Sequence, residues 1–387
     1  MDAVQLAAVL SAVVLLASVL SVELGVTVAL LELTLGVAAG NIFNLGSADW
    51  LNFIAGFASI VLTFLAGMEV DPDYMRRRLT ASVGIGVVSF IGPFVAASAT
   101  AYLLLGWTGR ASLITGTALS TTSLAVVYAV LVERGLTSTS VGKLLMSATF
   151  VTDLCTALAL SAIFIKPNAW FPAFLVISLG FILFLPRIAP WFFGRYGDRV
   201  IEPEIKLVFA VLLVLMVLAD ASNGHAVLPA FVLGLVMSKH YAEHREEQRR
   251  LRVVAFAFLT PFFFIKGGLN VSLGAVFSNL GLLAALLAAK MLPKIGFIYP
   301  LAHRADRDHG TFVTLLMSTG LTFGTISSLY GLNAGIIDKT QFSLLVTVVV
   351  LSAVVPTAIA ERWYLPDAER EQRIARRLAG AQSEEYV

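Results

Sequence analysis

Long apolar segments follow one another along almost the whole chain, and short polar segments separate them. A helix needs about 20 mostly apolar residues to cross the hydrocarbon core of a bilayer. Strands of a membrane barrel would be about half as long and would alternate in polarity. The pattern therefore predicts an all-α polytopic membrane protein with about thirteen transmembrane helices: 4–21, 24–41, 50–69, 80–105, 109–132, 142–164, 171–192, 205–220, 224–239, 253–270, 278–301, 311–330 and 341–360.

The composition supports this prediction. The 387 residues are 58% hydrophobic and 13% charged, whereas soluble domains carry about 25% charged residues. This argues against a soluble enzyme, a nucleic-acid-binding protein and a disordered protein. The single cysteine, Cys155, excludes a disulfide framework and a cysteine metal cluster. The first apolar segment lacks a basic n-region and a small-residue cleavage site, so we interpret it as a retained first span.

Basic residues indicate the orientation, because cytoplasmic loops of membrane proteins carry an excess of Lys and Arg. With the N-terminus outside, 21 of the 27 Lys and Arg residues fall in inner loops or in the C-terminal tail, and three fall in outer loops. The sequence thus predicts one membrane domain over 1–360, with its N-terminus outside. A charged cytoplasmic tail is predicted over 361–387.

Two spans are unusually polar in the middle: the fifth contains TALSTTSLA and the twelfth contains MSTGLTFGT. Each is the centre of a triplet of spans, and the triplets are seven spans apart, so they would form an inverted repeat. Paired interruptions of this kind indicate a transporter site, because unwound backbone is tolerated in a membrane only beside a cavity. Close packing of helices through small residues is the alternative. The candidate cation-binding residues here are Ser120, Thr121, Thr122 and Ser123, and the candidate supporting residues are Ser318, Thr319 and Thr322.

Asp153 lies at the middle of the span 142–164, eleven residues from either end. That distance is roughly 16 Å along a helix, so the side chain reaches neither water nor a headgroup. A carboxylate there costs several kcal/mol unless it faces a cavity or a partner. We therefore predict that Asp153 binds a cation or a proton, with oxygens from Thr152 and Thr156. A structural aspartate that is protonated or hydrogen-bonded is the alternative.

Four further ionisable residues inside the spans, Lys290, Lys294, Lys266 and Glu32, are candidates for supporting the core site. Lys290 and Lys294 share one face of the eleventh span, and Pro293 between them should kink it. Lys290 is too deep to reach the surface, whereas Lys294 could extend to the inner face. Lys266 lies close enough to the outer end for the same explanation. Glu32 is deep in the second span, where a protonated or paired acid at a helix interface is the simpler interpretation.

Catalytic motifs are absent from the sequence: it contains no H-E-x-x-H, nucleophile elbow or phosphate-binding glycine loop. We therefore predict that the protein is not an enzyme. We also predict that it needs no cofactor and binds no nucleic acid. The only metal expected is a monovalent cation at Asp153.

Several motifs together resemble the monovalent cation:proton antiporter-2 family, over roughly 4–360. Glu32, Gly36 and Gly40 match the E-x-x-x-G-x-x-x-G pattern of its second helix, and FLAGME, ending at Glu69, matches the end of its third. GTALSTTSLAVV and STGLTFGTISSLYGLNAG are similar to its two crossed helices. FLTPFFFIKGGL and the helix of Lys290 match its later core. ATFVTDLCTALAL resembles the ion-binding helix, with Asp153 at the essential aspartate.

The sequence departs from the family pattern in three places. Thr152 stands where the electrogenic sodium branch has Asp and the potassium branch often has Gln. Lys266 stands where an apolar residue is usual, and the second crossed helix lacks the charged residues common there. These departures concern the identity of the ion and the stoichiometry.

The resemblance implies a secondary antiporter that exchanges H⁺ for Na⁺ or K⁺ by alternating access, for pH and cation homeostasis in a prokaryotic inner membrane. It implies a homodimer with a core bundle from about 80–165 and 278–360 and a scaffold from the other helices. A separate regulatory subunit is compatible with it. Lys290 would neutralise converging helix ends or exchange its charge with Asp153. A cation channel or gated leak is the alternative, and an intramembrane enzyme would need a second catalytic group beside Asp153.

Overall fold

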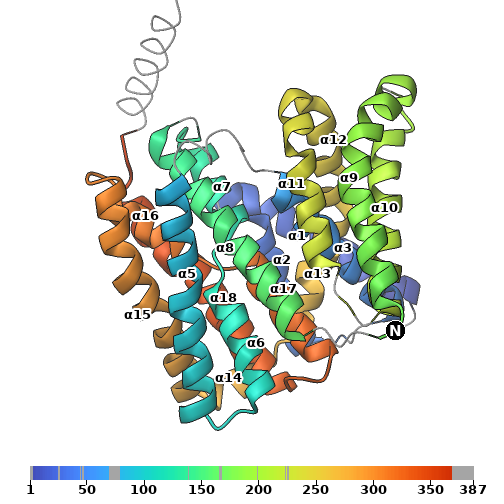
Figure 1. The fold of residues 1–387 in the computed structure, drawn as a ribbon. Helices are drawn as coiled ribbons and strands as arrows, with labels where there is room; N and C mark the ends of the chain where they lie inside the picture. The colour runs from blue at the N-terminus through green and yellow to red at the C-terminus, as the bar shows by residue number, and fades with distance from the viewer. Residues whose placement is uncertain are drawn as a thin grey trace, which may run out of the picture. The chain divides into compact units, whose positions relative to one another are not determined.

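The computed structural model describes residues 3–24, 27–43, 45, 48–68, 79–137, 139–164, 168–197, 199–222, 224 and 226–367. Its secondary structure within these ranges is helical, without strands (Figure 1). Two compact units share the chain. Unit 1 comprises Met1–Pro72 and Ala157–Leu273, and unit 2 comprises Asp73–Thr156 and Gly274–Val387. Glu69 and the tail beyond residue 367, both named in the sequence predictions, lie outside the described residues.

The helices of unit 1 are apolar except for the charged helix α12, Arg245–Val254. They are α1 (Ala3–Leu24), α2 (Val28–Ile42), α3 (Asp49–Met68), α9 (Phe171–Tyr196), α10 (Pro203–Ala221), α11 (Val227–Glu243), α12 (Arg245–Val254) and α13 (Thr260–Leu269). A π-helical turn, η2 (Ala255–Leu259), joins α12 to α13. The short helix α14 (Leu273–Phe277) begins where the chain passes to unit 2.

Glycines set the closest helix contacts of unit 1. A Cβ atom added to Gly36 of α2 would overlap the backbone of Ile265 in α13, and one added to Gly268 would overlap the backbone of α2. The same arrangement joins α3 to α11 through Gly67 and Gly234. Because glycine has no side chain, these helix backbones can pack in direct contact. The E-x-x-x-G-x-x-x-G pattern of α2 thus forms a helix-packing surface.

Unit 2 contains the two interrupted spans. Its helices are α5 (Leu79–Ala99) with the π-helical turn η1 (Thr100–Leu104), α6 (Gly109–Ser120), α7 (Leu124–Glu133), α15 (Leu280–Ala305), α16 (Gly310–Met317), α17 (Thr322–Asn333) and α18 (Lys339–Trp363). Helix α8 (Ser140–Phe164) begins in unit 2 and continues into unit 1. A hydrophobic core from α7, α8, α15 and α16 includes the fully buried Val127, Leu145, Ile298 and Val313.

The all-helical class predicted from the sequence is confirmed. Within the described ranges, nine helices are long and apolar enough to cross a membrane. Helix α2 is shorter, and α10 carries three charged residues near its ends. The exact number of thirteen crossings and the inverted repeat stay predictions. The short helix α14 was not predicted. The charged segment before residue 253 was expected to be a helix in a loop, but it is continuous with the tenth span, which therefore begins at Arg245.

Candidate functional site

Two helix interruptions lie against each other inside unit 2. The first is Thr121–Ser123, between α6 and α7, and the second is Ser318–Leu321, between α16 and α17; we call the two segments together the crossing. The Thr122 hydroxyl donates a hydrogen bond to the Met317 carbonyl at 2.9 Å. A Cβ atom on Gly320 would lie 3.1 Å from the Thr121 carbonyl oxygen. The hydroxyl-rich segments are therefore unwound at the predicted positions and contact each other.

Lys294 of α15 holds the crossing together. Its Nζ lies 2.8 Å from Thr122 Oγ1, 2.9 Å from the Met317 carbonyl oxygen, 3.0 Å from the Thr121 carbonyl oxygen and 3.0 Å from Ser89 Oγ. An ammonium group has three N–H donors, so these four acceptors can take up all of them. The two carbonyls terminate α6 and α16, and helix C-termini carry partial negative charge. The buried ammonium thus bridges two helix ends that would otherwise face each other.

Lys290, one turn earlier in α15, makes fewer contacts with the crossing. It is fully buried, and its Nζ donates to the Thr121 carbonyl at 3.3 Å. A Cβ atom on Gly320 would clash with this ammonium group. The sequence analysis assigned the converging helix ends to Lys290 and gave Lys294 a route to the inner face. The second expectation is wrong, because the side chain of Lys294 is fully buried and ends at the crossing.

Asp153 of α8 lies on the helix face that meets the crossing. Its side chain is 1% exposed, and Oδ1 has no hydrogen-bond partner among the described residues. Thr149, four residues earlier and so on the same face, donates its hydroxyl to Met317 Sδ at 3.5 Å. Asp153 also interacts electrostatically with Lys294. A buried carboxylate with an oxygen that makes no hydrogen bond can take up a proton or a cation.

The hydroxyls next to Asp153 are engaged in helix contacts. Thr152 Oγ1 donates to the carbonyls of Gly86 and Ala148, both at 3.1 Å, and thereby joins α8 to α5. Thr156 Oγ1 donates to the Thr152 carbonyl at 2.9 Å. A hydroxyl oxygen that donates its proton can still accept. Both threonines can therefore offer oxygen lone pairs to a ligand.

The other predicted hydroxyls are also buried, and most donate to their own helix. The acceptors are the carbonyls of Thr117 for Ser120, Ala118 for Thr121, Thr314 for Ser318 and Leu316 for Thr319, at 2.8–3.2 Å. Ser123 accepts from the Val126 amide at 3.4 Å, at the start of α7. Thr322, 8% exposed, begins α17. The four donated bonds use the hydroxyl protons of Ser120, Thr121, Ser318 and Thr319 and leave oxygen lone pairs.

Two residues of the site were missed by the sequence analysis. Ser89 of α5 contacts Lys294, and it could have been found as a polar residue in the middle of the fourth span. Met317 contributes its backbone carbonyl to Lys294 and its sulfur to Thr149. A backbone carbonyl has no sequence signature, so this contact could not have been predicted.

Glu32 and Lys266, also predicted as supporting residues, belong to unit 1. Glu32 of α2 is 1% exposed, and its Oε2 has no hydrogen-bond partner within the described part of the chain. Lys266 of α13 is 4% exposed. The expectation that Lys266 extends to the outer surface is therefore wrong. Both residues are described with unit 1, and their roles in the site stay predictions.

Comparisons with known proteins agree with this architecture. The family model described as "Sodium/hydrogen exchanger, transmembrane" matches residues 9–362. The chain is 25% identical over 340 residues to a probable Na⁺/H⁺ antiporter 3 of Methanocaldococcus jannaschii, covering 84% of this chain and 87% of that protein. It is 22% identical over 360 residues to the Na⁺/H⁺-K⁺ antiporter GerN of Bacillus cereus, covering 88% and 90%.

A solved structure shows the same fold. The sodium proton antiporter MjNhaP1 from M. jannaschii at pH 8 superposes with a TM-score of 0.69 at 13% identity, over 93% of this chain and 98% of that one. The apolar helices and these relatives identify an integral membrane protein, and the resemblance found in the sequence is confirmed. The chain belongs to the transmembrane sodium/hydrogen exchanger family, which is a family of transporters.

Proposed function

We propose that this protein is a secondary antiporter that exchanges H⁺ for Na⁺ or K⁺, with Asp153 as the group that takes up either ion. The buried Oδ1 without a partner, on the face of α8 that meets the crossing, is the observation that carries this proposal. The names of the relatives support it: one is named a probable Na⁺/H⁺ antiporter and another a Na⁺/H⁺-K⁺ antiporter.

Competition at one carboxylate is sufficient to couple the two fluxes. Asp153 can hold a proton or a monovalent cation, and either neutralises it. An ionised carboxylate without a partner is costly inside the membrane. The transporter therefore changes quickly between its outward-facing and inward-facing states when Asp153 is loaded, and slowly when Asp153 is empty. In this proposal unit 2, which contains Asp153 and the crossing, is the mobile core of a homodimer, and unit 1 is the scaffold.

The charges of unit 2 favour electroneutral exchange. Asp153 is the only acid of α8, so one cation displaces one proton and the site has the same charge in both loaded states. Thr152, in place of a second acid, donates to two backbone carbonyls. We retain the orientation inferred from the basic residues, with the N-terminus outside and the C-terminus in the cytoplasm of a prokaryotic cell.

Exchange in proteoliposomes with a trapped pH dye tests the proposal. Gradients of Na⁺, K⁺ and Li⁺ are applied in turn to the wild type, to Asp153→Asn and to Asp220→Asn. Asp220 lies at the exposed end of α10, so its amide variant is the matched control. We expect Asp153→Asn to abolish exchange and Asp220→Asn to retain it, because an amide cannot alternate between proton and cation. Residual antiport by Asp153→Asn above a small fraction of the wild type removes Asp153 from the mechanism. Cation flux without proton counter-flux in the wild type indicates a channel.

A further inference from the structure

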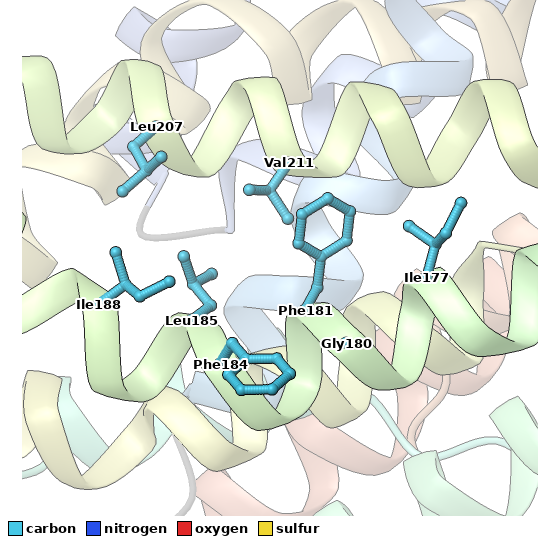
Figure 2. Close-up of a pocket in the computed structure, with 8 residues that line it drawn as sticks. All are labelled: Ile177, Gly180, Phe181, Phe184, Leu185, Ile188, Leu207 and Val211. Carbon is cyan, nitrogen blue, oxygen red and sulfur yellow. The ribbon is translucent and has the colours of Figure 1, made fainter.

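An apolar groove runs between α9 and α10 in unit 1 (Figure 2). Its volume is about 460 Å³, within the range of about 300–1,000 Å³ that is typical of ligand pockets. Helix α10 contributes Leu207 and Val211. Helix α9 contributes Ile177, Gly180, Phe181, Phe184, Leu185 and Ile188. None of these eight residues has a polar side chain, so the groove suits a hydrocarbon chain.

The groove has the length of one bilayer leaflet. Its lining positions on α9 recur at intervals of three and four residues, and therefore form one face of the helix. From Ile177 to Ile188 this face rises about 16 Å along the helix. Half the hydrocarbon core of a bilayer is about 15 Å thick. Helix α9 is itself long and apolar enough to cross a membrane, so an acyl chain can lie along the groove over its whole depth.

Aromatic and basic side chains continue the same face of α9 beyond the groove. Trp191 and Arg195 follow Ile188 at three and seven residues, and both are exposed. The guanidinium carbon of Arg195 lies 5.7 Å from the centre of the Tyr196 ring, which contacts Trp191 at 6.2 Å between centroids. Trp and Tyr gather at the membrane–water interface. Arg195, about 10 Å beyond Ile188 along the helix, is therefore at headgroup depth.

We propose that this groove and Arg195 form a binding site for one anionic phospholipid. One acyl chain lies in the groove, and the phosphate group contacts the Arg195 guanidinium. The order of the features along α9, from apolar to aromatic to basic, matches the order of the parts of a phospholipid from chain end to headgroup. The positive charge at the headgroup end favours an anionic lipid over a neutral one. By the orientation inferred from the basic residues, the lipid belongs to the cytoplasmic leaflet.

Two pairs of variants test the contribution of the groove and that of the Arg195 charge separately. A Cβ atom at Gly180 meets no atom within 4 Å, so a side chain can start there, and Gly180→Leu places an isobutyl group at the groove. Gly194→Leu is the matched control, because Gly194 has the same free space on α9 but does not line the groove. Arg195→Gln removes the charge. Arg249→Gln is its control, since Arg249 lies on the exposed surface of α12 and pairs with Glu246.

The experiment counts lipids retained by the full-length protein. Purified protein in detergent receives phosphatidylglycerol or phosphatidylcholine with identical chains, and native mass spectrometry measures the bound lipid per chain. We expect the wild type to retain one phosphatidylglycerol, about fivefold more tightly than phosphatidylcholine, since one basic residue near a membrane surface contributes about 1 kcal/mol. Gly180→Leu should lose both lipids, and Arg195→Gln should lose the preference. The two control variants should behave as the wild type.

Three results would overturn the proposal. Equal retention of the two lipids by the wild type would show that the basic end of the groove does not select a headgroup. Equal retention by Gly180→Leu and Gly194→Leu would show that no chain lies in the groove. A change of oligomeric state in Gly180→Leu with unchanged lipid retention would assign the groove to a second copy of the chain.

Discussion

Replacing Lys294 by Met tests whether one ammonium group holds the two interrupted spans together. Methionine has a similar length and carries no charge. The variant leaves the carbonyls of Thr121 and Met317, at the ends of α6 and α16, without the donor that now bridges them. Lys290→Met is the matched control, because it lies one turn away on the same helix and makes a single contact, at 3.3 Å.

The contacts give the size of the expected effect. Each hydrogen bond to a charged group contributes about 1.5–3 kcal/mol, and the variant removes the bonds made by the three N–H groups of Lys294. No acceptor is left without a partner: Thr121 O keeps its contact with Lys290, Met317 O keeps the Thr122 hydroxyl, and Ser89 lies 3.3 Å from Thr122 Oγ1. Removing a buried charge also returns part of its desolvation cost. We therefore expect a net loss of about 3 kcal/mol for Lys294→Met, and about 1 kcal/mol or less for Lys290→Met.

A thermal-shift measurement in detergent can resolve this difference. One kcal/mol shifts the Tm by about 2–4 °C in a chain of 150–250 residues, and by less in a longer chain. For this chain of 387 residues we expect Lys294→Met to lower the Tm by about 5 °C and Lys290→Met by about 1 °C. The reasoning fails if Lys290→Met lowers the Tm as much as Lys294→Met does, or if Lys294→Met has the same Tm as the wild type.

Three further predictions concern packing, charge movement and the crossing. Gly36→Ala should destabilise the protein by at least about 2 kcal/mol, because its Cβ meets the backbone of α13. Gly296→Ala in α15, where a Cβ meets nothing within 4 Å, should stabilise it by about 0.5–1 kcal/mol; a melting curve of each variant decides. Proton flux driven by one cation gradient should be nearly equal at 0 and at about −100 mV, because 1:1 exchange moves no net charge across the membrane. Moving one net charge would change the free energy by about 2.3 kcal/mol at that voltage, so a steep voltage dependence of the flux contradicts 1:1 exchange. Gly320→Ala should reduce exchange by displacing the ammonium of Lys290, and wild-type rates in proteoliposomes would contradict this.

Periodicity and local chemistry made much of the fold predictable. A run of about 20 apolar residues is long enough to predict a membrane-spanning helix wherever it occurs in the chain. The polar centres at Thr121 and Thr319 are also local signals, because hydroxyls and glycine allow a helix to unwind where packing provides partners. Both interruptions are found at these positions. The depth of Asp153 followed from counting residues, and its burial agrees with that count.

The contacts of the site were less predictable, because they depend on which helix faces which. Lys290 and Lys294 lie on one face of α15, and depth alone ranked Lys290 as the more important residue. The position of α15 along its axis relative to the crossing, which depth in the span does not give, places Lys294 against four acceptors and Lys290 against one. The contacts of Lys266 were equally hard to predict from its depth in the span. Proximity to a span end indicated a route to the surface, but the packing of its helix buries the side chain.

The arrangement around Lys294 also narrows where a transported cation can bind. The sequence analysis placed Thr121 and Thr122 among the candidate cation-binding residues. In the structure, their carbonyl and hydroxyl oxygens already accept from the Lys294 ammonium. A second cation at those oxygens would stand beside this positive charge, and repulsion between like charges is strong where little water screens them. The cation is therefore expected on the Asp153 side of the crossing, where the free carboxylate oxygen and the lone pairs of Thr156 remain available. In the proposed mechanism Lys294, in its ammonium form, keeps the cation out of the crossing, and the Asp153 carboxylate is the charged ligand of that cation.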